Sequence, residues 1–282
     1  MLYSPSVRRR RLAKLLAQLR DDADLTAAQV AKRLEWGSAT KLTRIENNEW
    51  RFPKISDVRD LLDLYGVTDE TVRAAILDLA RQGRERGWWE DYGDVLPPAM
   101  PGFEAEASRI LTYRSLLIAG LLQTTAYAEA VFRGGQVVAD DLIDRRVEAR
   151  AERQKILDSD NPPILWAIID EAALTKHVGG TKVMREQLLH IVEMARRPNI
   201  AVQVVPDAVG AQAAMENAFT ILEFDAPEDP TLVHVELITG DLFLETPEQV
   251  ASYTLVYDHV RASALSADAS VAYLADLAEQ LN

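Results

Sequence analysis

The first 86 residues contain five short stretches whose apolar residues recur with the spacing of one helix face, and this pattern constrains the fold most. Between residues 7 and 22, four leucines follow the i, i+3, i+4, i+7 order of an amphipathic helix. Similar stretches cover residues 26–34, 39–47 and 56–65, and a fifth begins after Thr68. The sequence therefore predicts an all-α head of five helices. Its expected core residues are Leu12, Leu15, Leu16, Leu19, Val30, Ala31, Leu34, Leu42, Ile45, Val58, Leu61, Leu62, Tyr65, Val72, Ile76 and Leu79.

The second and third helices of this head are short and closely spaced. Thr26 and Gln29 have the Thr-x-x-Gln spacing of a capping box, which predicts that the second helix starts here. A turn at residues 35–38 contains Gly37, and Ser38 is placed to cap the third helix. Two short helices joined by a glycine-containing turn, the second with a polar and basic outer face, are typical of a helix-turn-helix.

The string LTAAQVAKRLEWGSATKLTRIENNEWRFP resembles the Cro/lambda-repressor-type (Xre) helix-turn-helix family. Its segment LTRIEN, residues 42–47, is close to the usual ISRIEN of that family, and Pro53 opens the next helix. The resemblance covers residues 7–82. The sequence departs from the family in two places, because the turn at residues 35–38 is one residue longer and Asn48 replaces the usual glycine.

The resemblance implies that the partner is double-stranded DNA, an operator, and that the protein is a transcriptional regulator. Residues of the second helix would lie near a phosphate and a base edge, and those of the third would enter the major groove or touch the backbone. We expect no catalytic residue, no metal and no cofactor. The implied DNA-binding residues are Thr26, Gln29, Ser38, Thr40, Lys41, Thr43, Arg44 and Asn47.

Internal contacts are the alternative for several of these side chains. Arg44 either contacts DNA or pairs with Glu46 or Glu35, and Asn47 either contacts DNA or caps the third helix. For Lys41 we favour the DNA contact over an internal pair. We assign Glu46 to structure.

Two groups of side chains outside this motif also have two interpretations. The aromatic residues Trp36, Trp50 and Phe52 either stack on bases or pack, and we favour packing. Arginine runs at residues 8–11 and 145–153 form either solvated faces or sites for an anion or a docking partner, and we favour solvated faces.

Charge is distributed unevenly along the 282 residues. Of the 31 Lys and Arg and the 44 Asp and Glu, residues 1–86 contain 17 and 13, which leaves 14 and 31 for residues 87–282. The net charges of the two parts are therefore +4 and −17. This asymmetry favours a nucleic-acid-binding head on an acidic body.

The remaining sequence predicts a second domain of the α/β class. Residues 87–102 are rich in proline and are predicted to be a linker between the head, residues 1–86, and a domain at 103–282. The expected helices cover 104–111, 124–134, 140–157, 181–196, 247–262 and a stretch after Ser266. The expected strands of a mixed sheet cover 164–169, 201–205, 219–224, 232–237 and 241–245.

The second domain also resembles a known family. The segments PGFEAEASRILTYRSLLIAGLLQTTAYAEAVF, LWAIIDEAALTKHVGG and VEMARRPNIAVQVVP are similar to the large domain of unknown function that follows this helix-turn-helix in actinobacterial antitoxin-like regulators. Where that family usually has Pro-Gly-Leu-Leu-Gln-Thr, this chain has Ala119 in place of the proline. The resemblance implies that a small protein, encoded next door, is a partner. We further expect a homodimer whose two heads read half-sites about 34 Å apart.

The second domain has two alternative functions. One is a ligand-sensing repressor with a small-molecule pocket lined by the apolar strands. The other is an enzyme, which we do not expect, since the four histidines lack metal-ligand spacing and Gly179-Gly180-Thr181-Lys182 does not complete a phosphate loop. Asp170 and Glu171 end a strand, but acids there are also common as caps.

Composition excludes some compartments and chemistries. The chain has no cysteine, which excludes disulfides, thiolate metal sites and a cysteine nucleophile. No apolar run approaches the roughly 20 residues of a membrane helix, and the basic start lacks the apolar segment of a signal peptide. We therefore expect a cytoplasmic protein without a membrane partner.

Overall fold

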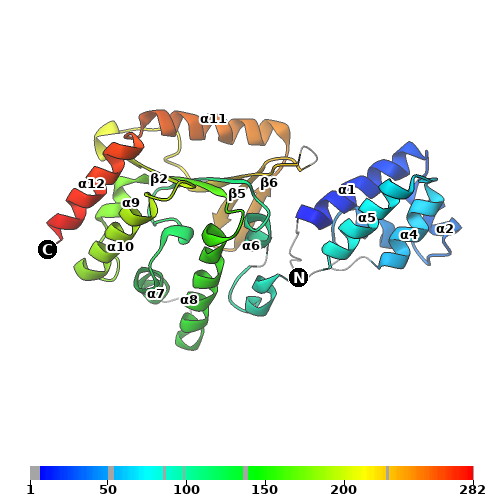
Figure 1. Ribbon diagram of the computed structural model, residues 1–282, viewed down its shortest axis with the longest axis horizontal. Helices are drawn as coiled ribbons and strands as arrows, with labels where there is room; N and C mark the ends of the chain where they lie inside the picture. Colours follow the sequence, from blue (N-terminus) through cyan, green and yellow to red (C-terminus); the bar gives the residue numbers. More distant parts are fainter. Residues whose placement is uncertain are drawn as a thin grey trace. The chain divides into compact units, whose positions relative to one another are not determined.

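The computed structural model describes residues 7–49, 54–84, 87–97, 99–135, 139–226 and 229–281. The chain divides into two compact units. The first consists of residues 1–91 with 97–106, and the second of residues 92–96 with 107–282. An all-α head is thus followed by a mixed α/β domain with extra helices, which is the predicted fold class (Figure 1).

The first unit contains the five predicted helices. Its core is formed by one apolar cluster to which α1, α3, α4 and α5 all contribute, including Leu16, Leu42 and Leu61, none of which is exposed to solvent. Val72 is the one misplaced core prediction, since 44% of it is exposed. The helices are α1 (Val7–Asp22), α2 (Ala27–Arg33), α3 (Thr40–Glu46), α4 (Ile55–Leu64), α5 (Glu70–Gln82) and α6 (Ala99–Glu104).

Each of the first four helices ends with a residue in the left-handed backbone region. The amide of this residue and the amide after it turn back to carbonyls of the last helical turn, which is the hydrogen-bonding pattern of a Schellman motif. After α2, for example, the amide of Trp36 donates to the carbonyl of Ala31 at 2.8 Å. Only one of these four residues is glycine. They are Asp24, Glu35, Asn48 and Gly66, with φ angles of 53°, 54°, 55° and 73°.

The second unit is built on a six-stranded mixed sheet with the order β3-β2-β1-β4-β5-β6. Strands β1, β2 and β3 are parallel, whereas β4, β5 and β6 pair in antiparallel fashion. All five predicted strands are present, and β2 and β3 pair in parallel fashion within the predicted mixed sheet. The strands are β1 (Arg109–Arg114), β2 (Ile164–Asp170), β3 (Ile200–Val205), β4 (Phe219–Glu223), β5 (Leu232–Leu237) and β6 (Gly240–Leu244).

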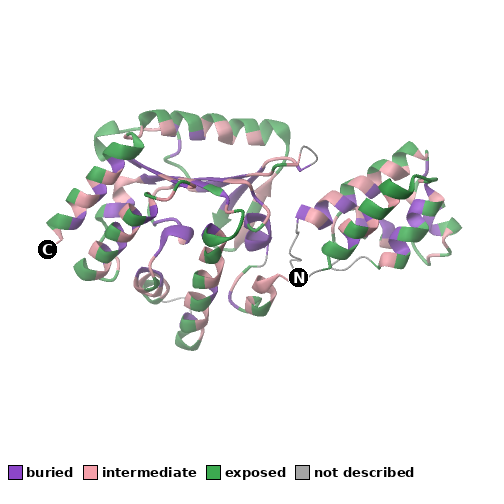
Figure 2. Ribbon diagram, viewed as in Figure 1, coloured by how far each residue is buried: buried purple, intermediate pink, exposed green. Residues whose placement is uncertain are grey.

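Helices cover both faces of this sheet. Figure 1 shows α11 (Pro247–Ser263) over one face and α7 (Thr125–Gly134), α8 (Asp140–Gln154) and α10 (Thr181–Met194) over the other. Only Tyr257 and Val260 of α11 are buried, so most of that helix faces solvent (Figure 2). The remaining helical elements are η1 (Trp88–Tyr92), η2 (Gly120–Leu122), η3 (Lys155–Asp158), α9 (Glu171–Thr175), η4 (Asp207–Val209) and α12 (Ala267–Gln280).

A buried polar network fixes the GLLQT segment, residues 120–124, to its surroundings. Gln187, which has no exposed surface, accepts a hydrogen bond from the amide of Thr124 at 2.6 Å and donates one to the carbonyl of Leu122 at 2.7 Å. The side chain of Gln123 accepts from Arg150 at 2.7 Å and donates to the carbonyl of Ile118 at 2.8 Å. These side chains therefore satisfy backbone groups that no helix or strand would satisfy.

The structure corrects the predicted helix at 104–111. That stretch spans the end of α6, the end of the first unit and the start of β1, a central strand of the sheet. Because β1 is covered on both faces, its residues 110–113 are all buried and show no alternation that would identify a strand. The predicted linker at 87–102 also differs, since it contains η1 and most of α6.

The first arginine run differs from the solvated face that we favoured, whereas the arginines of the second run are half-buried and some of them make internal contacts. Arg9 and Arg10 of α1 are each only 6% exposed. On α8, Arg145 pairs with Asp94 at 2.5 Å, and Arg150 lies over the ring of Phe132.

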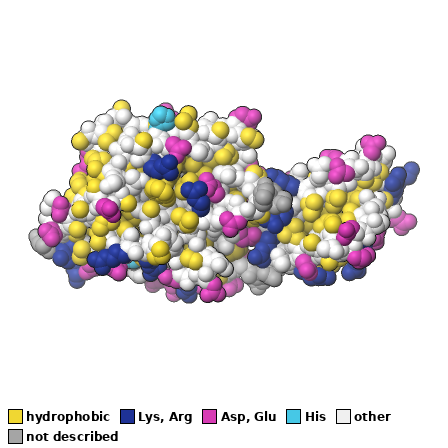
Figure 3. Space-filling view, turned by 45° about the horizontal axis from the view of Figure 1, so that its top comes forward, with side chains coloured by type: hydrophobic (Ala, Val, Ile, Leu, Met, Phe, Trp, Pro, Cys, Tyr) yellow, Lys and Arg dark blue, Asp and Glu magenta, His cyan; other side chains and the backbone are white. Residues whose placement is uncertain are grey.

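No helix among the described residues is long and apolar enough to span a membrane. In the view of Figure 3, acidic and basic side chains are interspersed over the second unit. The net negative charge of this part of the sequence is thus not gathered into one patch on that face.

Candidate nucleic-acid interface

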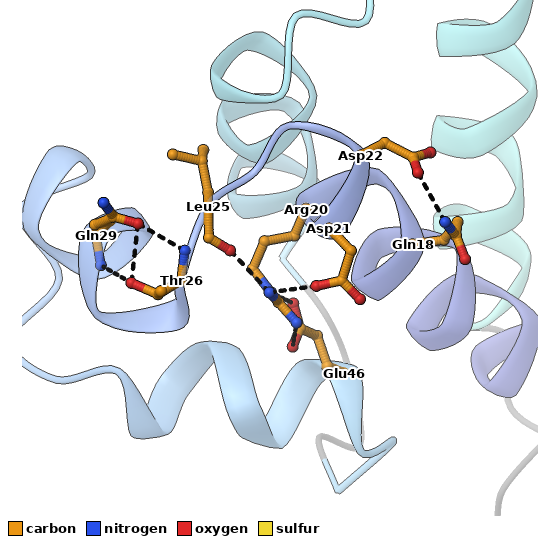
Figure 4. Close-up of polar contacts among 8 residues, drawn as sticks. All are labelled: Gln18, Arg20, Asp21, Asp22, Leu25, Thr26, Gln29 and Glu46. Atoms are coloured by element: carbon orange, nitrogen blue, oxygen red, sulfur yellow. Dashed lines mark hydrogen bonds and ion pairs between the residues drawn. The ribbon is translucent and has the colours of Figure 1, made fainter.

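The start of α2 is fixed by the predicted capping box. The amide of Gln29 donates to Thr26 Oγ1 at 3.3 Å, and the amide of Thr26 donates to Gln29 Oε1 at 2.8 Å. The Thr26 hydroxyl also donates to Gln29 Oε1 at 3.0 Å (Figure 4). Both side chains are exposed, so they lie on the surface at the place where the resemblance implied a phosphate and a base edge.

The turn between α2 and α3 is shaped by Glu35 and Ser38. Glu35 takes the left-handed conformation in this turn, whereas Gly37 has no positive φ angle. Ser38 Oγ accepts from the amide of Thr40 at 3.1 Å and lies 2.8 Å from Thr40 Oγ1. Ser38 therefore satisfies a free amide of the first turn of α3, although the residue directly before the helix is Ala39.

The opposite end of α3 is fixed by an ion pair that the sequence did not predict. Arg20, in the last turn of α1, donates from Nε to Glu46 Oε1 at 2.8 Å and from Nη2 to Glu46 Oε2 at 3.3 Å. Its Nη1 atom donates to the carbonyl of Leu25 at 2.8 Å (Figure 4). One guanidinium thus links α1, the segment before α2, and α3. Glu46 has the structural role that we assigned to it.

The same ion pair affects two pKa values. The hydrogen bond and charge of Glu46 raise the pKa of Arg20 above its ordinary value. Burial raises the pKa of Tyr65, and the negative charge of Glu46 raises it further. Arg20 and Tyr65 therefore keep their protons at neutral pH.

The outer face of α3 displays four of the predicted DNA-binding residues. Thr40, Thr43, Arg44 and Asn47 are all exposed. Glu46, one of the two internal partners considered for Arg44, is already bound to Arg20. Among the described residues the side chain of Arg44 makes no hydrogen bond or ion pair, so its guanidinium is available to a ligand.

The polar side chains near Arg44 use only part of their hydrogen-bonding capacity within the protein. Thr43 Oγ1 donates to the carbonyl of Ala39 at 3.3 Å, and Asn47 Nδ2 lies 3.5 Å from Glu49 Oε1, a long contact. Asn47 stands at the end of α3 and closes it through its backbone amide, not through its side chain. Small polar side chains beside a free arginine are a suitable set for base edges and phosphates.

Lys41 lies in a different environment from its neighbours on α3. Its Nζ atom is 2.7 Å from Asp57 Oδ1 on α4 and 3.9 Å from the centre of the Trp36 ring. Its side chain is 26% exposed. The structure therefore shows Lys41 in an internal pair, whereas the sequence favoured a DNA contact for it.

The aromatic residues of the motif are placed in part. Trp36 is half-buried and packs against the core cluster of the first unit, as the packing interpretation requires. Trp50 and Phe52 lie outside the described residues, as does Pro53.

The acids at the end of β2 are used for structure. Asp170 Oδ1 accepts from the amide of Ala172, and its Oδ2 accepts from the hydroxyl of Tyr113 at 3.2 Å. Burial and the charge of Asp170 raise the pKa of Tyr113 to about 12. Glu171 accepts hydrogen bonds from the amide of Asp207 at 2.7 Å and from the hydroxyl of Tyr273 at 2.5 Å. Both carboxylates thus act as caps and anchors.

Taken together, these features define the first unit as a helix-turn-helix domain and the second as a mixed α/β domain. Comparison with known families agrees: residues 11–75 match a family described as helix-turn-helix domain, and residues 98–276 match the family described as Domain of unknown function (DUF5753). The second match covers more than half of the chain, so the protein belongs to the DUF5753 family. Searches of curated proteins and of solved structures gave no match.

Proposed function

We propose that this protein is a sequence-specific DNA-binding transcriptional regulator that inserts α3 into the major groove of an operator. The observation that carries this proposal is the outer face of α3, where Arg44 is exposed and has no partner among the described residues. The match to a helix-turn-helix domain supports DNA as the ligand class. Within this proposal, Thr26, Gln29, Ser38, Thr40, Thr43, Arg44 and Asn47 contact DNA, as the resemblance to the Xre family implies.

The test is a titration of operator binding at several salt concentrations. We expect Arg44→Ala to weaken binding by about 1–3 kcal/mol and to lower the magnitude of the salt slope by about one, because one phosphate or base contact is lost. Arg81→Ala is the matched control, since it removes the same charge from an exposed site on α5. Equal affinity of the Arg44 variant and the parent chain, or a flat salt dependence of the parent, contradicts the proposal.

The second domain, in this proposal, joins two chains and binds a small protein encoded next to this one. A single short recognition helix supplies little affinity, which favours a dimer with paired heads. Sedimentation of the full chain tests the dimer, and co-purification with the neighbouring gene product tests the antitoxin-like role. A ligand-sensing pocket is the alternative, and a shift of the melting temperature with small molecules would favour it.

We propose a binding role, not catalysis, for the second domain. Asp170 and Glu171, the acids best placed for chemistry, are already engaged as caps and anchors. A screen of residues 87–282 for hydrolase and transferase activity tests this, and turnover that Asp170→Asn abolishes would contradict it. A cytoplasmic location follows from the proposed DNA ligand.

A further inference from the structure

We infer that Lys41 does not read DNA but is a positioning residue, which holds the recognition helix α3 against α4 through Asp57 and Trp36. This inference rests on the proposed function, because it assigns the way in which the DNA-binding face is presented. It also changes one of the DNA contacts implied by the resemblance. Of the two cations of α3, Lys41 pairs within the protein and Arg44 contacts the DNA.

The first argument is the geometry of the Lys41 ammonium group. It donates to Asp57 Oδ1 at 2.7 Å, a distance typical of a charge-assisted hydrogen bond. It also lies 3.9 Å from the centre of the Trp36 ring, well within the roughly 6 Å limit of a cation–π contact. Trp36 belongs to the turn before α3, and Asp57 belongs to the first turn of α4. Lys41 therefore joins three consecutive parts of the motif.

The second argument is the burial of Asp57. Its side chain is only 9% exposed, and its Oδ2 atom is buried without a hydrogen-bond partner among the described residues. A buried carboxylate needs a nearby positive charge, and the ammonium of Lys41 supplies it. If Lys41 turned to a DNA phosphate, this carboxylate would lose that partner. The cost of that loss opposes a DNA contact by Lys41.

The third argument is the small apolar contact area of α3. The helix has seven residues, and only Leu42 and Ile45 are buried. Two apolar anchors do not fix the rotation of so short a helix about its own axis. The Lys41–Asp57 pair fixes its first turn to α4, and the Arg20–Glu46 pair fixes its last turn to α1. With both ends fixed, Thr40 and Arg44 face outward in a defined orientation.

The experiment is a double-mutant cycle of Lys41→Met and Asp57→Asn in the full chain. It is read by operator affinity, by affinity for unrelated DNA and by the salt slope. We expect each single variant to weaken operator binding about tenfold and the double variant to be no weaker than either single one. The salt slope and the affinity for unrelated DNA should stay those of the parent, whereas Arg44→Ala lowers the slope by about one.

The Asp57→Asn variant separates the two roles of Lys41. If Lys41 binds a phosphate directly, Asp57→Asn frees the cation and removes a negative charge, so operator binding should stay equal or become tighter. Either result overturns the inference. So does a lower salt slope for Lys41→Met. All affinities are measured at a temperature at which circular dichroism shows each variant folded, so that a loss of affinity through unfolding is excluded.

Failure of this inference can be told apart from failure of the proposed function. If the parent chain binds no DNA at low salt, the regulator assignment fails, and the positioning role fails with it. If the parent binds and Arg44→Ala changes the slope, but the Lys41 and Asp57 effects are additive, only the positioning role fails. Lys41→Arg keeps the charge with a different shape, and it should restore part of the lost affinity if the pair with Asp57 is what matters.

Discussion

The guanidinium of Arg20 holds the carboxylate of Glu46 through two nitrogen–oxygen contacts of 2.8 and 3.3 Å, although the residues are 26 positions apart. The side chains are 18% and 10% exposed, so both charges are largely removed from water. We expect Arg20→Met to lower the free energy of unfolding of the head by about 2–3 kcal/mol, because it leaves the Glu46 carboxylate without its partner. Urea denaturation measures this effect.

The control for this prediction is the exposed ion pair of Arg81 and Asp78 on α5. Its side chains are 56% and 59% exposed, and we expect Arg81→Met to change the stability by less than about 0.5 kcal/mol. The paired variant Arg20→Met with Glu46→Leu should recover part of the loss, since no charge then remains buried. Equal effects of Arg20→Met and Arg81→Met would contradict a structural role for the buried pair.

Glu35 offers a stabilising substitution in the turn of the motif. It has a φ angle of 54°, where side chains with a β-carbon are strained. We expect Glu35→Gly to raise the free energy of unfolding by about 0.5–1 kcal/mol, after the greater freedom of glycine in the unfolded chain is deducted. The mirror experiment is Gly66→Ala, at a φ of 73°, which should destabilise by about 1 kcal/mol. Thermal melts of both variants show whether each substitution raises or lowers the stability of the head.

Gln187 carries a prediction for the second domain. Gln187→Leu leaves the amide of Thr124 and the carbonyl of Leu122 without their present partner. Each lost partner in a buried site costs about 1–3 kcal/mol, so we expect a total loss of about 2–4 kcal/mol. Leu189→Gln, at a position of α10 that is 40% exposed, is the matched control and should be nearly neutral. Urea denaturation of the two variants under one set of conditions measures both free energies of unfolding, and equal losses would contradict the prediction.

The stability of the second domain should depend on pH through His190. Burial lowers the pKa of His190 below its ordinary 6.5, and the charge of Arg197 lowers it further. In the unfolded chain His190 takes up a proton near pH 6.5, whereas in the folded chain it does so only at lower pH. Its contribution is therefore fully present above pH 6.5 and is lost as the pH falls below that value.

The variant that tests this pH dependence is His190→Gln. We expect the difference in melting temperature between pH 7.5 and pH 5.5 to be smaller in this variant than in the parent chain. His259→Gln, at an exposed position of α11, is the control and should keep the parent's difference. A titration of the His190 ring by NMR that gives a pKa above 6.5 would reverse the sign and refute the argument.

Local signals in the sequence were enough to predict much of the fold. The capping box of Thr26 and Gln29, the proline at the start of α11 and the cap of Ser266 on α12 all depend on residues within one turn, and all are present. The strand β1 was missed because it is buried on both faces and its apolar run fits a helix equally well. α6 was missed because Pro101 indicates a break, although proline is tolerated in the first turn of a helix.

The candidate site was predicted as a set of residues but not as a set of roles. Thr40, Thr43 and Arg44 on α3, and Asn47 directly after it, are exposed, as a helical period predicts. Which cation is committed to the protein depends on partners 16 and 26 positions away, and residue spacing along one helix carries no information about them. Only the packing of α1 and α4 around α3 distinguishes Lys41 from Arg44.

The brevity of α3 limits what one copy of the head is able to recognise. Seven helical residues rise about 10 Å, which is the length of roughly three base pairs of a duplex. A sequence of three base pairs recurs many times in any genome that offers about a million competing sites. If α3 reads DNA as we propose, one head alone cannot specify a unique site, and selectivity would require a second head bound beside the first.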